Sequence, residues 1–336
     1  MTTRTPTAVA AAARPLSGLL RSDWGRFLGS RALTLVVSFA FLAVVTFSIV
    51  QLIPGDPARA IAGNEATVEQ LAEVRRDLGL DQPIATQFGN YLAGIFDGTL
   101  GRSYRTGTVA ELISVRIPYT LGVALPAIVV TFLVAIPLGL GVAVATQGGR
   151  RRRLGVVFSW ITAAVDAVPV YVRAALLVLV FALSLKWLPA GGAQTQAAYV
   201  LPITALAIGP ICSLSRVARR EAEVALEADF VRTLRGWRLP ARRIHIKYIA
   251  PTLLTSVLTM SGMMLAGMIG GALVMESVFS WPGLGTGVVQ AILVKDFPVV
   301  QGTILVLGMV AVVVNLVVDI ALAVIDPKLL KDGRSH

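Results

Sequence analysis

The sequence predicts an all-α, polytopic membrane protein with six transmembrane helices. Of its 336 residues, 55% are hydrophobic and 15% are charged, and the mean hydropathy is +0.75. Soluble domains hold roughly 45–50% apolar and about 25% charged residues, so this composition excludes a disordered chain and disfavours a soluble domain. The alternating segments of about 10 residues that indicate a barrel do not occur. Helices therefore satisfy the backbone groups within the bilayer.

Six stretches are candidate spans, because a helix needs about 20 apolar residues to cross a bilayer. Five contain no charged residue, namely 32–55, 117–149, 187–215, 248–275 and 297–318. The sixth, 154–188, is apolar apart from Asp166, Arg173 and Lys186. It is longer than one crossing of roughly 30 Å. We expect a single long helix here that bends near Pro169.

Between these spans the chain divides into five regions. An apolar segment longer than the 7–15 residues of a signal-peptide core follows the N-terminal arm, so the first span is expected to stay uncleaved. The segment after this span opens with a helix stop at Ile53–Pro57, and Thr67 and Gln70 fit a capping box before an amphipathic helix. The regions are a cytosolic arm (1–31), a first transmembrane helix (32–53), an extracytoplasmic cap (54–118), a five-helix core (119–326) and a cytosolic tail (327–336).

Membrane topology explains the excess of basic residues. The net charge of +11 would suggest nucleic acid as a partner of a soluble protein. With both termini in the cytosol, 21 of the 30 Lys and Arg residues lie inside and 8 outside, as the positive-inside rule requires. The Arg150–Arg153 run in a short loop is the strongest orientation signal. We expect cytosolic termini, contact of the arm with anionic membrane lipid, and no nucleic-acid partner.

The chain offers few residues for catalysis or metal binding. Cys212 is its only cysteine, and His245 and His336 are its only histidines, which is too few soft ligands for a transition-metal cluster. The phosphate-binding pattern G-x-x-x-x-G-K-[ST] and the nucleophile pattern G-x-S-x-G are both missing. We therefore expect a protein that is not an enzyme and binds no cofactor itself.

The inner loop 216–249, between the fourth and fifth spans, carries the most specific pattern. Acidic residues come first and arginines last over 221–238, the order that a helix dipole favours. Phe230, Leu234 and Trp237 are spaced to form one apolar stripe, and Pro240 can begin the next helix. The pattern predicts a short amphipathic cytosolic helix. Three placements of this helix stay open: docked on a partner, lying in the lipid interface, or packed on the protein's own loops.

This loop resembles the EAA loop of ABC importer permeases, and specifically the B-type permease of dipeptide, oligopeptide and nickel importers. The resemblance begins with Glu227-Ala-Asp-Phe-Val-Arg-Thr-Leu-Arg-Gly-Trp-Arg-Leu-Pro240. Further motifs in the family's order are Pro54-Gly55-Asp56-Pro57, Leu78-Gly79-Leu80-Asp81-Gln82-Pro83, Gly98-Thr99-Leu100-Gly101-Arg102-Ser103, Glu276-Ser-Val-Phe-Ser-Trp-Pro-Gly-Leu-Gly285 and Asn315-Leu-Val-Val-Asp319. Each motif alone is weak, whereas together and in order they are specific.

The resemblance implies a permease subunit in the bacterial cytoplasmic membrane. It would import small peptides, with nickel or glutathione as the alternative substrate. Its partners would be a homologous second permease, two cytosolic ATPases that bind ATP and Mg, and an extracytoplasmic binding protein docked on the cap and on loop 276–298. The residues expected to couple to the ATPase are Leu226, Glu227, Asp229, Phe230, Val231, Arg232, Leu234, Arg235 and Trp237.

Two departures from the family and two other readings stay open. Arg238 stands where the family's loop has glycine, and Asp166 and Arg173 stand where it is small or apolar. These two charges are candidate substrate-pathway residues, and a structural link to another span is the equal alternative. An ion-coupled secondary transporter would use Asp166, Arg173 and Asp319 as a relay, but its usual inverted repeats are not visible. A membrane scaffold without transport would have no use for the stripe.

Overall fold

The structure is a computed structural model that describes residues 16–52, 56–63 and 65–325. Within these ranges the chain is helical, and its single β feature is an isolated bridge between Arg102 and Thr108. The expected all-α class is therefore confirmed. The predictions for the start of the arm, for the Pro54-Gly55 stop and for the tail fall outside the described residues.

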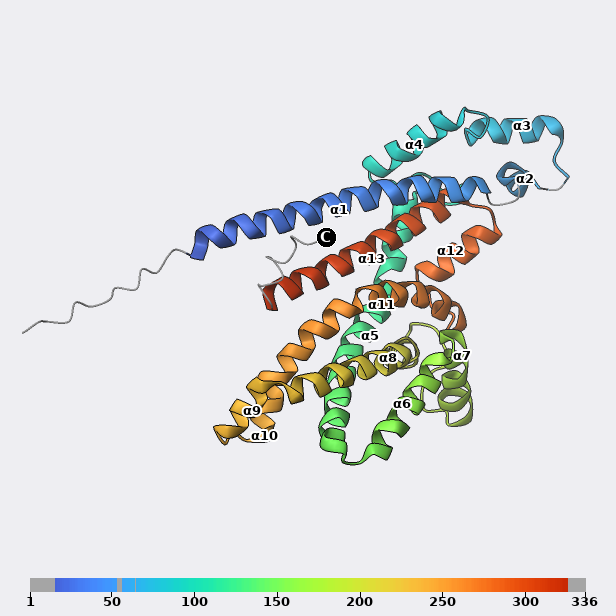
Figure 1. The fold of residues 1–336 in the computed structure, drawn as a ribbon. Coiled ribbons are helices and arrows are strands. Elements are labelled where there is room, and N and C mark those ends of the chain that lie inside the picture. The colour runs from blue at the N-terminus through green and yellow to red at the C-terminus, as the bar shows by residue number, and fades with distance from the viewer. Residues whose placement is uncertain (1–15, 53–55, 64, 326–336) are drawn as a thin grey trace, which may run out of the picture.

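The elements follow one another with short connections (Figure 1). They are α1 (Leu16–Leu52), α2 (Pro57–Ala62), α3 (Val68–Asp77), α4 (Ile84–Phe96), α5 (Val109–Thr146), η1 (Gln147–Gly149), α6 (Arg152–Ala167), α7 (Val170–Leu177), η2 (Val178–Ser184), η3 (Gln196–Tyr199), α8 (Val200–Glu227), α9 (Asp229–Gly236), α10 (Ala241–Ile244), η4 (His245–Ile249), α11 (Ala250–Val278), α12 (Leu284–Leu293) and α13 (Phe297–Ile325).

Several helices are long enough to span a bilayer. Among the described residues, four stretches meet both length and apolarity: Trp24–Ile49, Val109–Gly149, Gln196–Glu227 and Phe297–Ile325. A bent pair, α6 with α7 and η2, meets them only when counted together. α11 and α13 each have 29 residues. The chain thus has the build of a polytopic membrane protein.

The sequence prediction for residues 154–188 was wrong in form. The segment is not one helix with a bend, because α6 and α7 are separate helices that meet at an angle of 96°. The break falls at Val168 and Pro169, both of which have extended backbone angles. A proline disfavours helical geometry in the residue before it, so Val168 leaves the helix there. The prediction placed the proline correctly but underestimated its effect.

Two predicted boundaries also moved. α1 begins at Leu16, so the second half of the expected arm 1–31 continues the first transmembrane helix. α8 begins at Val200 and runs to Glu227, whereas the charge-free stretch suggested a span over 187–215. Charged residues do not end a helix that extends beyond the bilayer, so the distribution of charge marked the membrane region and not the helix itself.

The cap is formed by the short helices α2, α3 and α4, which lie near the C-terminal end of α1 (Figure 1). The predicted capping box is confirmed, since Thr67 Oγ1 accepts from the Gln70 N–H and Gln70 Oε1 accepts from the Thr67 N–H. Asp56 caps α2 through the Ala58 N–H and pairs with Arg75 of α3 at 2.6 Å. These contacts fix the cap locally, at the end of the fold away from α9 and α10.

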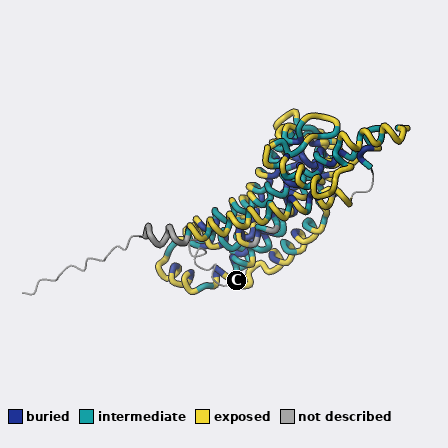
Figure 2. Tube along the Cα trace, turned by 90° about the horizontal axis from the view of Figure 1, so that it is seen from above, coloured by how far each residue is buried: buried dark blue, intermediate teal, exposed yellow. Residues whose placement is uncertain are grey.

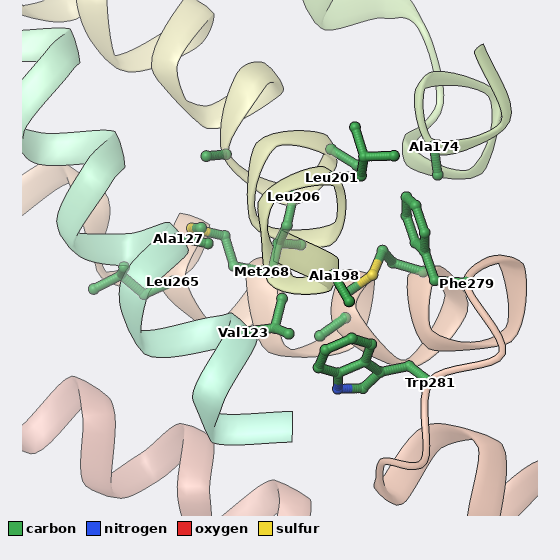
Figure 3. Packing of buried hydrophobic residues seen from close by; sticks show 14 residues of the cluster. Val123, Ala127, Ala174, Ala198, Leu201, Leu206, Leu265, Met268, Phe279 and Trp281 are labelled. Atoms are coloured by element: carbon green, nitrogen blue, oxygen red, sulfur yellow. The ribbon is translucent and has the colours of Figure 1, made fainter. Parts of the chain in front are cut away.

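The main core lies where α5, α7, α8 and α11 meet (Figure 3). α5 packs closely along α8 because Gly139 has no side chain. A Cβ there would lie 2.6 Å from the Ser215 carbonyl oxygen. Trp281, in the turn after α11, is fully buried, and its Nε1 donates to the Tyr119 carbonyl at 3.0 Å. By contrast, most of α1 is exposed (Figure 2), as is usual for a helix that other chains or lipid cover.

Candidate functional site

The candidate site begins where α8 ends, at the end of the fold opposite the cap (Figure 1). Ala228 has extended backbone angles of −64° and 149° and separates α8 from α9. The predicted single helix over 221–238 is therefore wrong, because its acidic first half belongs to α8 and its basic second half belongs to α9. Asp229 stands in the first turn of α9 and Arg235 in its last, so the dipole argument holds for α9 itself.

One face of α9 is anchored to the rest of the protein. Val231 and Leu234 are buried, and they belong to a cluster with Leu226 of α8, Ile249 of η4 and Leu253 of α11. Full burial of an aliphatic side chain contributes about 1.5–3 kcal/mol. α9 is thus attached to two long helices by packing, and it has to move with them.

The rest of the α9 surface is open. Phe230 is 43% exposed and Trp237 is 70% exposed, whereas Leu234 points inward. The predicted stripe of three residues is therefore corrected, since only its two aromatic members face outward. Arg232 and Asp229 pair at 3.4 Å on the exposed surface, and Glu227 and Arg235 are exposed beside them. α9 presents two aromatic rings surrounded by charges.

The turn after α9 holds its shape without the glycine of the family. Arg238 has a φ of 53°, in the left-handed region that glycine adopts at little cost. The Leu239 N–H donates to the Leu234 carbonyl across this turn at 3.3 Å. Pro240 then precedes α10, as predicted. Burial lowers the pKa of nearby His245, and the charge of Arg235 lowers it further, which favours a neutral imidazole in this turn.

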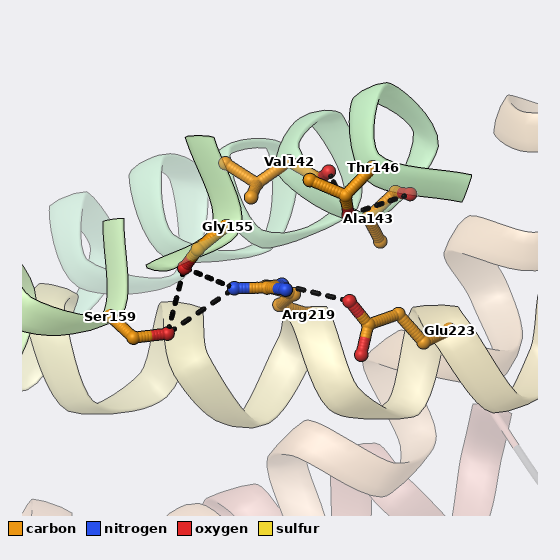
Figure 4. A network of polar contacts seen from close by, with 7 residues as sticks. All are labelled: Val142, Ala143, Thr146, Gly155, Ser159, Arg219 and Glu223. Carbon is orange, nitrogen blue, oxygen red and sulfur yellow. Dashed lines mark hydrogen bonds and ion pairs between the residues drawn. The ribbon is translucent and has the colours of Figure 1, made fainter. Parts of the chain in front are cut away.

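A polar brace ties α8 to α6 on the same side of the protein (Figure 4). Arg219 of α8 donates from Nη1 to the Gly155 carbonyl at 2.7 Å and to Ser159 Oγ at 3.2 Å. Its Nε donates to Glu223 at 2.8 Å. A Cβ at Gly155 would lie 2.6 Å from Nη2 of the arginine, so this glycine makes room for the brace. A shift of α8 is therefore passed directly to α6.

Asp166 and Arg173, two of the three charged residues in the apolar segment 154–188, do not meet. Asp166 pairs with Arg216 of α8 at 2.7 Å, an ion pair of the kind that the structural alternative for the aspartate involves. Arg173 lies against Gly209, and its Nε and Nη1 are buried without a hydrogen-bond partner in the described part of the chain. The group holds two cations and one carboxylate. It therefore retains one positive charge that no carboxylate in this group balances.

One arrangement of polar residues was missed in the sequence. Glu276 at the end of α11 is fully buried, and its carboxylate accepts hydrogen bonds from Thr120 and from the Gly285 N–H, each at 2.6 Å. It thus caps the N-terminus of α12 from a different helix. The sequence did contain a signal for this contact, since Glu276 precedes the glycines of its own motif. In the structure, a Cβ at Gly283 would come within 2.2 Å of the carboxylate.

Comparison with known proteins identifies the family. A sequence model described as "Binding-protein-dependent transport system inner membrane component" matches residues 135–331. The N-terminal model of the same systems matches residues 25–124. Together they cover most of the chain, including α9 and the cap.

Relatives and a solved structure agree with this match. A peptide transport system permease protein of Brucella abortus is 35% identical over 87% of this chain and 94% of its own. The glutathione transport system permease protein GsiC of Salmonella typhimurium is 34% identical over 88% and 96%. A chain of the MetNI methionine ABC transporter, in an inward-facing conformation, shares the fold with a TM-score of 0.53 at 17% identity, over 64% of this chain and 97% of its own.

These matches exclude the reading of an ion-coupled secondary transporter. The ionisable relay that this reading needed is also divided, since Asp166 pairs with Arg216 and Asp319 with Arg31. The chain belongs to the binding-protein-dependent transport system inner membrane components, and it is a multi-pass permease subunit of an ABC importer.

Proposed function

We propose that α9 is the element through which a cytosolic ATPase drives this permease, and that the permease imports small peptides. The observation that carries the coupling role is the contrast between the buried and the exposed side chains of α9. Val231 and Leu234 attach it to α8 and α11, while Phe230 and Trp237 are free to enter a partner's surface. Buried aromatic anchors of this kind dominate small interfaces.

The path of the motion follows from the packing. A displacement of α9 acts on α8 and α11 through the cluster around Leu226, and the Arg219 brace passes it to α6. Helices packed at native density shift as rigid units. Two such permeases, each pushed by one ATPase that binds ATP and Mg, would change the access of the pore from outside to inside.

The proposed topology has six spans with both termini in the cytosol. The spans are α1, α5, the α6–α7–η2 pair, α8, α11 and α13. This arrangement places α9 and Arg150–Arg153 inside and the cap outside, in line with the charge distribution. The binding protein would dock on the cap and on the 276–298 segment, and the second permease would be a homologous chain. Reporter fusions at Gln147 and Gly333 should read as cytosolic and one at Gly192 as external. An external signal at Gly333 would contradict this topology.

The substrate class rests on the relatives. The similar permeases are named for peptide transport and for glutathione transport, and glutathione is itself a tripeptide. Small peptides are thus the substrate proposed here, with glutathione as the second candidate and nickel as the third. Uptake of labelled dipeptides, oligopeptides, glutathione and nickel in a strain that lacks this permease, with and without the gene restored, distinguishes the three.

The coupling role is tested on α9 directly. Phe230→Ala with Trp237→Ala should insert normally but lose ATPase association, since truncation of such anchors costs about 2–4 kcal/mol each. Trp187→Ala is the matched control, because this tryptophan is equally exposed but lies away from α9. Copurification of the ATPase and substrate-stimulated ATP hydrolysis are measured. Normal association and transport in the double variant would show that α9 is not the coupling element.

A further inference from the structure

A cavity of about 360 Å³ lies beside the Arg219 brace, between the end of α5, the start of α6 and α8. Its inner wall is polar, with Thr146, Ser159 and Glu223 among the lining residues. Its outer wall contains Arg152 and Trp160. The proposed coupling passes through the Arg219 brace beside this cavity, but neither the coupling nor the transport of peptides needs the cavity to be filled.

The charge of the cavity is not balanced. Glu223 is engaged by Arg219 at 2.8 Å, so the acid and this arginine neutralise each other. Arg152 belongs to the exposed run Arg150–Arg153, and no acidic side chain in the described ranges forms an ion pair with any of its four members. The outer wall therefore has a net positive charge and suits an anionic group.

The surface next to Arg152 is apolar and faces outward. Trp160 is 74% exposed, and Val156, Val157 and Ile161 beside it on α6 are each at least half exposed. α6 is one half of the bent apolar pair that meets the criteria for a span. Tryptophan is enriched where a membrane meets water, and arginines anchor a helix to the headgroups at that level.

We propose that this cavity binds the headgroup of an anionic phospholipid of the inner leaflet. The phosphate would lie against Arg152 at the mouth of the cavity, and the acyl chains would run along Val156 and Trp160. A protein partner would need acidic residues at the level of the arginines and an apolar surface directly beside them. An anionic lipid has this arrangement in every molecule.

The lipid would also have a place in the mechanism. It would sit against α6 and α8 at the brace, where the motion of α8 reaches α6. The proposal rests on the membrane location of the chain and on the proposed topology, which puts this cavity at the inner leaflet, and it stands or falls separately from the coupling role of α9.

The test uses the complete transporter in nanodiscs with brominated phosphatidylglycerol or brominated phosphatidylcholine at equal mole fractions. Bromine quenches tryptophan on contact, and the difference between the native protein and Trp160→Phe isolates the signal of Trp160. One arginine near an anionic surface favours binding about fivefold, so the quenching titration should show about that preference for phosphatidylglycerol. Arg152→Gln should abolish the preference and Arg152→Lys should retain it. Arg243→Gln, an exposed arginine of α10 on the same side, should leave it unchanged.

Four results would overturn the proposal. Equal quenching by the two lipids in the native protein would show that the cavity does not select a headgroup. A preference that survives Arg152→Gln would place the selection elsewhere. Weak quenching of Trp160 by both lipids would show that a protein partner covers this face. Inorganic phosphate is added as a further arm, and competition by it at millimolar concentration would assign the cavity to a free anion instead of a lipid.

Discussion

The Glu276 carboxylate and the Thr120 hydroxyl join α11 to α5 by a buried hydrogen bond of 2.6 Å. Thr120 Oγ1 in turn accepts from the Leu284 N–H at 2.9 Å, and the other carboxylate oxygen accepts from the Gly285 N–H. Two helices thus share the capping of a third. Arg116 of α5 adds a contact from Nη1 to the Gly283 carbonyl at 3.2 Å. The turn between α11 and α12 is therefore fixed by a small network of polar groups.

We predict that Glu276→Ala destabilises the turn between α11 and α12. The change leaves the Gly285 N–H and the Thr120 hydroxyl without a buried acceptor, and each such group costs about 1–3 kcal/mol. Glu276→Gln keeps one acceptor oxygen and should cost less. Thermal unfolding of the purified protein, with Glu111→Ala as a control at an exposed capping box, measures both. Equal midpoints for all three variants would contradict the role of the carboxylate.

We predict that Arg238→Gly stabilises the loop after α9. The left-handed backbone at a φ of 53° costs a residue with a side chain about 1–2 kcal/mol, which glycine avoids. Part of this gain is offset by the greater freedom of glycine in the unfolded chain, so the expected gain is about 0.5–1 kcal/mol. Arg238→Ala should bring no gain, because alanine keeps the strain. A gain shared equally by both variants would assign the effect to charge and not to the backbone.

We predict that Arg173→Gln lowers the uptake of peptides with a free carboxylate more than that of amidated peptides. The guanidinium carries the charge that Asp166 leaves unbalanced, because Asp166 already pairs with Arg216. Uptake kinetics are measured in proteoliposomes with saturating binding protein, so that the permease step limits the rate. Arg216→Gln serves as the contrast, since breaking the ion pair should lower stability and affect both peptides alike. Unchanged kinetics in an assembled Arg173→Gln transporter would leave this arginine with a structural role alone.

We predict that acid loosens the cap through Asp56. Partial burial alone would raise its pKa, but the hydrogen bonds from Arg75 and from the Ala58 N–H outweigh burial and hold the pKa below the ordinary value. A carboxyl whose pKa is lowered on folding stabilises the folded state at pH values above its unfolded pKa of about 3.9. This stabilisation is lost as the pH falls through the lower pKa of the folded state.

The effect is small, because the pair is largely exposed and such pairs contribute about 0–1 kcal/mol. The protection of the α2 amides from hydrogen exchange, measured relative to the intrinsic exchange rate at each pH, should therefore fall by a few-fold at most on acidification. Asp56→Asn keeps an N-cap oxygen and removes the charge, so this protection should show less dependence on pH at the same sites. Equal pH dependence in both proteins would exclude Asp56 as the group responsible.

The sequence was sufficient to predict the fold class and the approximate positions of the apolar helices. Charge-free stretches of about 20 residues or more reflect the bilayer, which acts on composition and not on detailed packing. The Thr67 capping box and the break before α10 depend on neighbouring residues alone, so they could be predicted from local patterns. The all-α fold and the family of the chain followed from these signals together with the order of the motifs.

The rest depended on contacts between distant segments. The spacing of Leu234 placed it beside Phe230 and Trp237, but Ile249 and Leu253 cover it, and no periodicity in α9 reveals these neighbours. The partner of Asp166 lies 50 residues further along the chain. The angle at Pro169 depends on how α7 packs against α8. In each case the sequence indicated what kind of residue needed a partner but did not reveal which distant residue the partner is.

The pairing of α1 with α13 also bears on how the chain is made. Arg31 and Asp319 form an ion pair at 3.1 Å, although about 290 residues separate them in the sequence. At a synthesis rate of about 5–20 residues per second, α1 leaves the ribosome some 15–60 s before its partner helix exists. During this interval Arg31 is solvated by water and headgroups at the membrane surface. The first helix to be inserted can thus contact α4 early, through Thr46 and Tyr91, but its ion pair with α13 forms only when the chain is nearly complete.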